Sequence, residues 1–268
     1  MKKQYIFLLS GLAIVLSLYF FGKTVSEDKP SVPNKAPKAQ GFDIQNFISQ
    51  QKSALPAVSL ALLNSKEDSL GRFTDPLKKS GCFTQLANFW KDSLHVPEIY
   101  AHYISEASKL DNSEKKLTFA GQLFLELLRS EQDQAKLEWE SAEAISFFQK
   151  AIELNPSSDD LKIDLASCFI YGKGRSGDPA ETMKGIQQLL SVVRKDSTNM
   201  KAQMLLGVGG FVSGQYDKAI VRLKKVVEQQ PDNVEAVAFL ADTYAAQGNT
   251  TEAIRWYEVS KKMVNNPD

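Results

Sequence analysis

The chain has 268 residues, of which 43% are hydrophobic and 24% are charged, so it is long enough to bury a sizeable core and is not disordered throughout. Lysine plus arginine equal aspartate plus glutamate at 32 each. This balance argues against a nucleic-acid-binding protein, which needs a basic face to hold phosphates.

An apolar segment without charged residues covers residues 5–22. As a helix it would span roughly 27 Å, close to the thickness of the hydrocarbon core of a bilayer. Tyr19, Phe20 and Phe21 at its end are typical of an interfacial anchor. We therefore predict a transmembrane signal-anchor in residues 1–22, with cleavage after Ser26 as the alternative.

The orientation of this segment follows from the charges around it. Lys2 and Lys3 favour a cytoplasmic N-terminus, although Lys23 and Lys29 lie just beyond the span. A short polar head before an apolar span is the form of an export signal. We expect the body of the protein to lie outside the cytoplasm.

Residues 23–41 are rich in proline and lysine and contain almost no large apolar residue. Such a segment cannot bury enough surface to offset the entropy of ordering it, so it is predicted to be a flexible linker. Residues 42–112 form an N-terminal helical region, with helices expected at 43–52, 56–63, 76–90 and 97–110. These helices are either degenerate repeats or a layer that caps a solenoid, and we favour the cap.

A repeat occupies the rest of the chain. Gly185-Ile186, Ala219-Ile220 and Ala253-Ile254 follow one another at intervals of 34 residues, and Asn199 recurs as Asn233 at the same interval. Within a unit, two amphipathic helical patterns are joined by a glycine turn. Small residues fall where the two backbones of such a hairpin must approach closely.

These features resemble the tetratricopeptide repeat (TPR) family, with units at 114–158, 159–199, 200–233 and 234–267. The resemblance implies an all-α, right-handed helical solenoid over residues 113–268. The first unit contains an insertion of about 11 residues between its helices, and the second has one of about seven in its turn, at 172–179. The layout is also similar to single-pass TPR proteins of the bacterial inner membrane, with the body on the periplasmic side.

In TPR proteins the first helices of successive hairpins line a concave groove, and the resemblance implies that this groove binds a protein or peptide segment. Its middle is apolar here, which suits an apolar or amphipathic segment. The alternative is that the protein's own N-terminal helices, or the segment around Leu137 and Trp139, fill it. Glu235 occupies one of the groove positions, and the candidate binding residues are Leu125, Ile163, Ile170, Tyr171, Lys201, Met204, Val208, Phe211 and Val212.

No catalytic, cofactor-binding or metal-binding residues are predicted. The glycine-rich segment 172–177 superficially resembles a phosphate cradle, but Asp178 stands where a P-loop has lysine, which favours an exposed turn. His95 and His102 lack partners at a metal-ligand spacing. The sequence therefore predicts neither an enzyme nor a cofactor.

The two cysteines, Cys82 and Cys168, are predicted to be small buried hydrophobes, with a disulfide as the alternative. At the other end of the chain, no capping helix follows the last unit. Trp256, Val259 and Met263 are therefore expected to be exposed and to support self-association into a homo-oligomer.

Together these patterns predict a membrane-tethered scaffold for protein–protein interaction, or an assembly or chaperone-like adaptor. A cytoplasm-facing adaptor that docks cytosolic enzymes at the membrane is the alternative. An enzyme with its site in the inserted loops is the third hypothesis, and the absence of a convergent acid, base or metal set in the sequence weighs against it.

Overall fold

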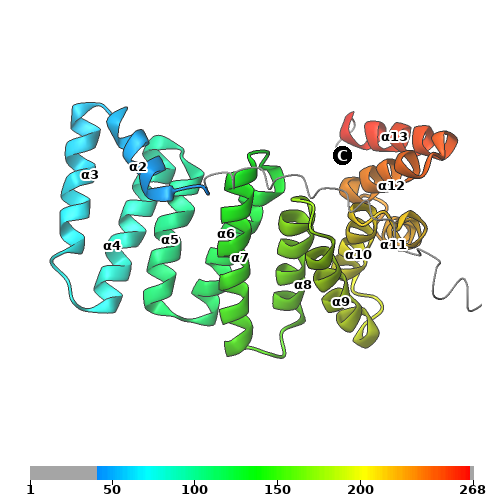
Figure 1. Ribbon diagram of the computed structural model, residues 1–268, viewed down its shortest axis with the longest axis horizontal. Coiled ribbons are helices and arrows are strands. Elements are labelled where there is room, and N and C mark those ends of the chain that lie inside the picture. The colour runs from blue at the N-terminus through cyan, green and yellow to red at the C-terminus, as the bar shows by residue number, and fades with distance from the viewer. Residues whose placement is uncertain (1–40, 266–268) are drawn as a thin grey trace, which may run out of the picture. The chain divides into compact units, whose positions relative to one another are not determined.

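The computed structural model describes residues 41–265, and every regular element in that range is a helix (Figure 1). Between these residues no helix combines the length and the apolar character needed to cross a bilayer. The predicted membrane anchor at 5–22 lies outside the described residues, and so does the predicted linker apart from Gly41.

The helices follow one another with short connections. Two of the helical elements, η1 and η2, are π-helical turns, each of which extends the α-helix before it. In chain order the elements are α2 (Ile44–Ser53), α3 (Ala57–Leu70), α4 (Pro76–Phe89), η1 (Trp90–Leu94), α5 (Pro97–Asp111), α6 (Glu114–Ser130), α7 (Gln134–Leu154), α8 (Asp159–Ser167), η2 (Cys168–Gly174), α9 (Pro179–Lys195), α10 (Met200–Val212), α11 (Tyr216–Gln229), α12 (Val234–Gln247) and α13 (Thr250–Asn265).

The recurring asparagines cap the first helices of two successive units. The side-chain oxygen of Asn199 accepts a hydrogen bond from the backbone N–H of Ala202 at 2.9 Å, and that of Asn233 does the same for Ala236 at 2.9 Å. A cap of this kind is worth about 1 kcal/mol to a helix. The interval seen in the sequence thus marks equivalent helix starts.

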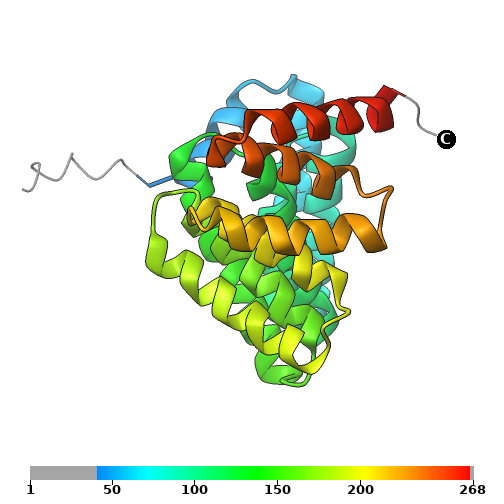
Figure 2. The same cartoon turned by 90° about the vertical axis from the view of Figure 1, so that its right-hand side faces the viewer.

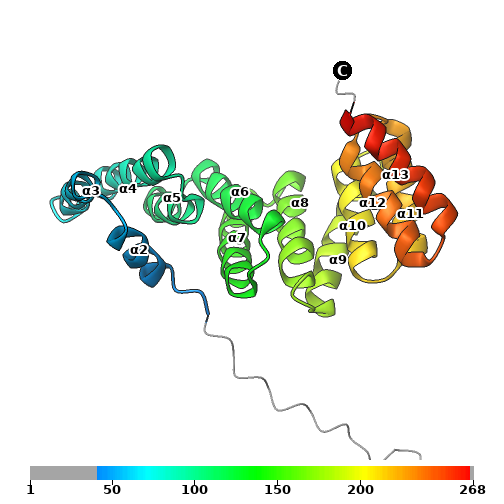
Figure 3. The same ribbon diagram turned by 90° about the horizontal axis from the view of Figure 1, so that it is seen from above.

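From α6 onward the helices pair into antiparallel hairpins, α6 with α7, α8 and η2 with α9, α10 with α11, and α12 with α13. The second helix of each hairpin packs on the first helix of the next, α7 on α8 and η2, α9 on α10, and α11 on α12. Figure 2 shows the last of these steps, with α11, α12 and the red α13 stacked in order. Seen from above, α6 and α8 lie on one side of the row and α7 and α9 on the other (Figure 3). The prediction of an all-α, TPR-like helical solenoid is confirmed.

Glycine is required where the two helices of a hairpin meet. A Cβ atom at Gly207 of α10 would lie 2.6 Å from Cγ of Leu223 on α11, and one at Gly121 of α6 would lie 3.0 Å from the Phe148 ring on α7. Both glycines occupy the eighth place of their unit. Their small size allows a neighbouring large side chain to fill the space against the helix backbone.

The N-terminal helices do not pack as the predicted cap of the solenoid. Helices α4 and α5 form a hairpin of their own, and α5 packs on α6 just as the later second helices pack on first helices. They therefore extend the stack instead of closing it, while α3 packs on α4 and α2 on α5. The turn η1 and the left-handed His95 (φ 56°) lengthen the connection between α4 and α5, which moves this hairpin off the 34-residue interval.

The two insertions are mostly helical. The expected loop of the first unit is only the connection 131–133, because α6 and α7 are each longer than expected. Asp133 starts α7 by accepting a hydrogen bond from the N–H of Lys136. In the second unit, η2 takes up part of the insertion and leaves 175–178 as the turn.

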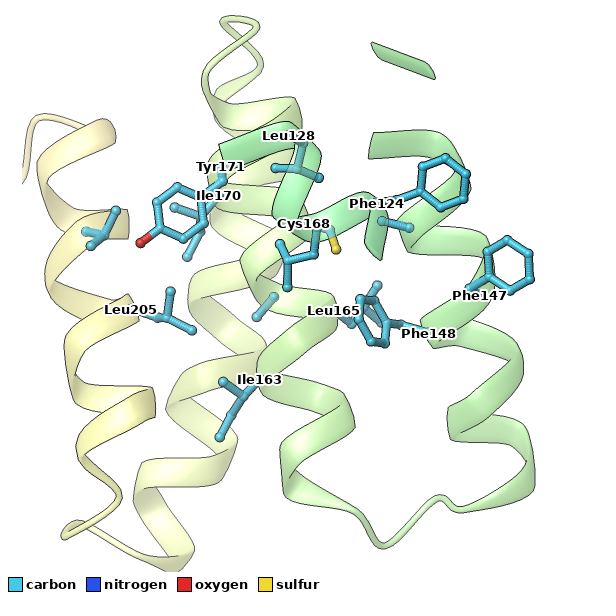
Figure 4. Packing of buried hydrophobic residues seen from close by; sticks show 14 of the residues in the cluster. Phe124, Leu128, Phe147, Phe148, Ile163, Leu165, Cys168, Ile170, Tyr171 and Leu205 are labelled. Atoms are coloured by element: carbon cyan, nitrogen blue, oxygen red, sulfur yellow. The ribbon is translucent and has the colours of Figure 1, made fainter. Parts of the chain in front are cut away.

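One apolar core runs through the stack. Figure 4 shows the Phe148 ring beside Leu165, with Cys168 above them and Leu205 on the far side of the same layer. Cys168 and Cys82 are both buried free thiols, as the simpler of the two sequence interpretations predicted. Burial also raises the pKa of the Cys168 thiol, which keeps it protonated and unreactive.

Candidate protein-interaction surface

Most of the apolar groove residues expected from the repeat register lie in the core instead of on an open surface. Ile163 and Ile170 are fully buried and Val208 is 1% exposed, while Leu125 is 6% exposed. They pack between first helices that lie directly side by side, since α6 contacts η2 and η2 contacts α10. Their role in binding stays a prediction, and in this structure their contacts are within the protein.

The remaining predicted residues reach the surface of the first helices. Phe211 and Val212 are half-buried at the end of α10, where the Phe211 ring packs edge-on against Phe239 of α12 at a centroid distance of 6.0 Å. Tyr171 and Met204 are 8% and 7% exposed and border a pocket, and the side chain of Lys201 is 51% exposed.

This pocket, which we call the first-helix pocket, has a volume of about 220 Å³. It brings together side chains from four successive hairpins, including both apolar and charged groups. It is lined by Arg129, Tyr171, Met200, Lys201, Met204, Leu205, Gln230, Asn233 and Glu235.

A chain of polar contacts crosses the pocket. The Arg129 guanidinium lies over the Tyr171 ring, 5.2 Å from its centroid, and the Tyr171 hydroxyl donates a hydrogen bond to Glu235 at 3.2 Å. Burial and, next, the Glu235 carboxylate raise the pKa of Tyr171 above its ordinary value, so the hydroxyl keeps its proton. Helices α6 and α12 are thereby linked through η2, across α10.

A second row of polar contacts joins α6, α8 and α10, toward the N-terminal side of Arg129 in α6 and of Tyr171 in η2. The carboxylate of Asp164 in α8 accepts from Lys201 of α10 at 2.6 Å and from Gln122 of α6 at 3.3 Å. Asp164 is 5% exposed, so removing either partner would leave a desolvated carboxylate poorly satisfied. This second row joins the first helices of three consecutive hairpins, α6, α8 and α10, whereas the bond from Tyr171 to Glu235 passes over α10.

Sequence analysis missed Arg129 and Asp164. Arg129 was not considered because the segment around it was expected to begin an inserted loop, whereas it belongs to the last turn of α6. Asp164 lies one residue after the groove position Ile163, in a helix that also contains Asp159 and Asp160. Its only distinguishing signal is its position between the apolar Ile163 and Leu165.

The glycine-rich segment 172–177 packs closely against neighbouring side chains. A Cβ at Gly172 would lie 2.1 Å from Oγ of Ser141, and one at Gly174 would lie 2.4 Å from Oγ1 of Thr182, so neither position tolerates a side chain. Arg175 of the same turn donates to the backbone carbonyls of Leu128, Arg129 and Glu131 and so satisfies the end of α6. Residues 175, 177 and 178 are exposed as expected for a turn, whereas Gly172 is buried and Arg175 also connects this hairpin to the end of α6.

The helices that sequence analysis considered for filling the groove lie elsewhere. The Phe42 ring packs against Trp139 of α7 at a centroid distance of 4.9 Å, and α2 packs on α5. Helices α5 and α7 are second helices, so these contacts lie away from the first-helix pocket. Within residues 41–265, no group of three His, Cys, Asp or Glu side chains is placed to hold a metal ion.

The last helix exposes a different set of side chains from the predicted one. Trp256, Val259 and Met263 are half-buried, because the face of α13 that carries Ala253 and Trp256 packs on α12. The large apolar side chains that face outward are Ile254 (55% exposed), Tyr257 (44%) and Val264 (62%). Self-association through this helix stays a prediction, with these residues as the exposed ones.

Comparisons with known proteins agree with this architecture. Two segments match tetratricopeptide-repeat family models, residues 213–267 and 140–158. A search of curated proteins found no match.

Among solved structures, a tetratricopeptide repeat protein from Parabacteroides merdae is 13% identical with a TM-score of 0.54, covering 80% of this chain and 77% of its own. MamA from Desulfovibrio magneticus RS-1, from residue 41 to its end, is 15% identical with a TM-score of 0.51, covering 70% and 97%. PilW, a type IV pilus biogenesis factor, is 21% identical with a TM-score of 0.50, covering 70% and 79%. The hairpin stack and these similar structures show an all-α helical solenoid, in which residues 140–158 and 213–267 match tetratricopeptide-repeat models.

Proposed function

We propose that this protein is a protein-interaction scaffold or assembly adaptor, and that the first-helix pocket holds a segment of the partner. The observation that carries the proposal is the convergence of Arg129, Tyr171, Lys201, Met204 and Glu235 from successive repeats on one pocket. Proteins built from tetratricopeptide repeats act mainly by binding other proteins. No catalytic role is part of this proposal.

The chemistry of the pocket favours an amphipathic segment over a wholly apolar one. Met200 and Met204 offer polarizable side chains that adapt to irregular apolar surfaces. Lys201 and Glu235 lie at the edge with opposite charges, so a segment with a few polar groups beside one or two apolar anchors fits best.

Photo-crosslinking tests this assignment. A photoreactive amino acid at position 201, whose native side chain is 51% exposed, should capture the partner in cells that produce the full-length chain. The matched control is the same amino acid at Glu153, which is exposed on the second helix α7. Capture at 201 that Met204→Glu abolishes supports the proposal, whereas equal capture at 153, or none at 201, contradicts it.

We further propose that residues 5–22 tether the scaffold to the bacterial inner membrane and that the body lies on the periplasmic side. This proposal rests on the uncharged apolar segment and on Lys2 and Lys3 before it. A body that faces the cytoplasm is the second candidate, because Lys23 follows the segment. A C-terminal reporter that is active only in the periplasm separates the two orientations, and a chain recovered in the soluble fraction would contradict the tether.

A further inference from the structure

A second hollow lies between the second helices α9 and α11, with α10 as its floor. We call it the second-helix groove. Its volume, about 470 Å³, is more than twice that of the first-helix pocket. Its lining is mostly aliphatic, with Met183, Ile186 and Leu190 from α9, Leu206 from α10 and Val221 from α11.

This groove and the first-helix pocket open on opposite sides of α10. Met204 lines the pocket and Leu206 lines the groove, and two residues along an α-helix correspond to a rotation of about 200°. A ligand in one site therefore does not reach the other. The two surfaces can be tested separately.

The glycines of α10 explain the depth of the groove. A Cβ at Gly209 would lie 3.0 Å from Cγ1 of Ile186, and one at Gly210 would lie 3.1 Å from Cβ of Ala219 and 3.2 Å from its backbone nitrogen. Both neighbouring helices therefore pack close to the backbone of α10. At Gly210 the floor of the groove consists of the α10 backbone, which leaves space between the side chains of α9 and those of α11.

The walls of the groove expose apolar side chains to solvent. Val221 is 68% exposed and Met183 is 39% exposed, although both belong to well-packed amphipathic helices. A contiguous exposed apolar surface on a folded protein is typical of an interaction site. Burying these side chains under a partner would remove that surface from water.

The charges along the groove indicate the chemistry of the occupant. Lys218 and Arg222 line it from α11, one helical turn apart, and neither forms an ion pair within residues 41–265. Each donates a hydrogen bond to a neutral glutamine, Lys218 to Gln215 and Arg222 to Gln203, both at 2.8 Å. Asp217, the only acidic residue of the lining, accepts from Gln247 of α12 at 2.6 Å. Two basic side chains against one acidic side chain leave the lining with a net positive charge.

We propose that the second-helix groove binds an amphipathic helix of a partner protein, with aliphatic side chains against Met183, Ile186 and Val221 and acidic side chains beside Lys218 and Arg222. Two parallel walls of helix with an apolar floor suit a helix laid lengthwise, which is a common way to recognise an amphipathic segment. The opposite charges select acidic over basic partners. The inference is independent of the proposed first-helix site, because it concerns the other side of α10.

Peptide binding tests the proposal on the purified full-length chain. The probes are two fluorescein-labelled helical peptides of about 20 residues, both with leucine at i, i+3, i+4 and i+7. One has glutamate flanking the leucines and the other has lysine at the same places. Fluorescence anisotropy should show that the acidic peptide binds at least about tenfold more tightly than the basic one.

Variants assign the binding to the groove. Val221→Glu should weaken the acidic peptide about tenfold or more, and the double variant Lys218→Glu, Arg222→Glu should reverse the preference to the basic peptide. Val264→Glu is the matched control, since Val264 is 62% exposed on α13, away from the groove. Lys201→Glu controls for the first-helix pocket, once thermal denaturation shows that the variant stays folded without the ion pair between Lys201 and Asp164.

Three results would overturn the proposal. They are no binding of the acidic peptide, equal binding of the two peptides, and a loss on Val264→Glu or Lys201→Glu as large as that on Val221→Glu. Sedimentation velocity adds a fourth, because an oligomer of the free protein that Val221→Glu converts to a monomer would identify a second copy of this chain as the occupant.

Discussion

Tyr171 and Glu235 lie 64 residues apart in the chain and are joined by a hydrogen bond of 3.2 Å between the tyrosine hydroxyl and the carboxylate. One residue belongs to η2 and the other to the first turn of α12, so the bond passes over α10. In a stack where each hairpin mainly contacts its neighbours, this bond couples units that are two repeats apart.

The first prediction concerns this coupling. Tyr171→Phe should lower the free energy of unfolding by about 0.5–1.5 kcal/mol, because it removes the donor and leaves the ring in place. Urea denaturation followed by circular dichroism measures the change. Tyr171→Phe and Glu235→Gln should not be additive, and a double-mutant cycle with an interaction energy near zero would show that the bond adds nothing.

The helix hairpins after residue 113 follow from the sequence because their signals are local. The small residues Gly207 and Ala219 lie at the close contacts between helices that the sequence predicts. Asn199 and Asn233, which recur in the sequence, prove to cap two equivalent helices. Such signals remain readable without knowledge of the neighbouring units.

The candidate surface follows from the sequence only in part, because it depends on how hairpins sit against each other. Tyr171, Lys201, Met204 and Glu235, which the register places on the groove side, all line one pocket. Ile163 and Ile170, which it also places there, are buried where neighbouring first helices pack. Their roles in binding a partner stay predictions. The second-helix groove had no sequence signal, since Val221 and Met183 look like ordinary members of amphipathic helices.

The second prediction concerns Gly210. Alanine is the better helix former by about 1 kcal/mol, yet Gly210→Ala should destabilise the protein, since the new methyl group would lie 3.1–3.3 Å from Cβ, N and Cα of Ala219. Gly81 of α4 is the control, because nothing lies within 4 Å of a Cβ built there. Thermal denaturation should show a lower Tm for Gly210→Ala and an equal or higher Tm for Gly81→Ala. The same sign of change for both variants would contradict the packing explanation.

The third prediction uses a buried acid on α7. Glu140 is 1% exposed, and neither of its carboxylate oxygens has a hydrogen-bond partner among residues 41–265. Burial raises the pKa of its carboxyl from 4.5 to about 8, and the carboxylates of Glu131, Glu98 and Asp133 add to the rise against the opposing effect of Lys136. The folded state therefore holds a proton that the unfolded state has released between these two pH values.

The contribution of the protonated Glu140 carboxyl to the free energy of unfolding is fully present below pH 4.5 and is lost as the pH rises to about 8. Glu140→Gln keeps the shape and cannot ionise, so the variant should be more stable than the native chain at pH 8.5, by about 1 kcal/mol or more, and similar to it at pH 4.5. Urea denaturation at both pH values measures the difference. A constant difference between the two proteins at all pH values would mean that Glu140 does not titrate in this range.

The fourth prediction concerns the attachment of α2 to the stack. The centroid of the Phe42 ring lies 4.9 Å from that of Trp139 and 5.4 Å from that of Phe47, and the Lys136 ammonium lies 5.8 Å from the Phe42 centroid. Phe42 therefore joins the start of α2 to α7. Phe42→Ala should remove most of this contact. Amide hydrogen exchange should then become faster across residues 44–53, while α6 and α7 keep their protection, because they are held by the shared core.

Phe73→Ala is the control, since Phe73 is 38% exposed and its ring contacts Lys78 of the adjacent α4. If both variants leave the exchange of residues 44–53 unchanged, α2 is held by its contact with α5 and Phe42 is dispensable.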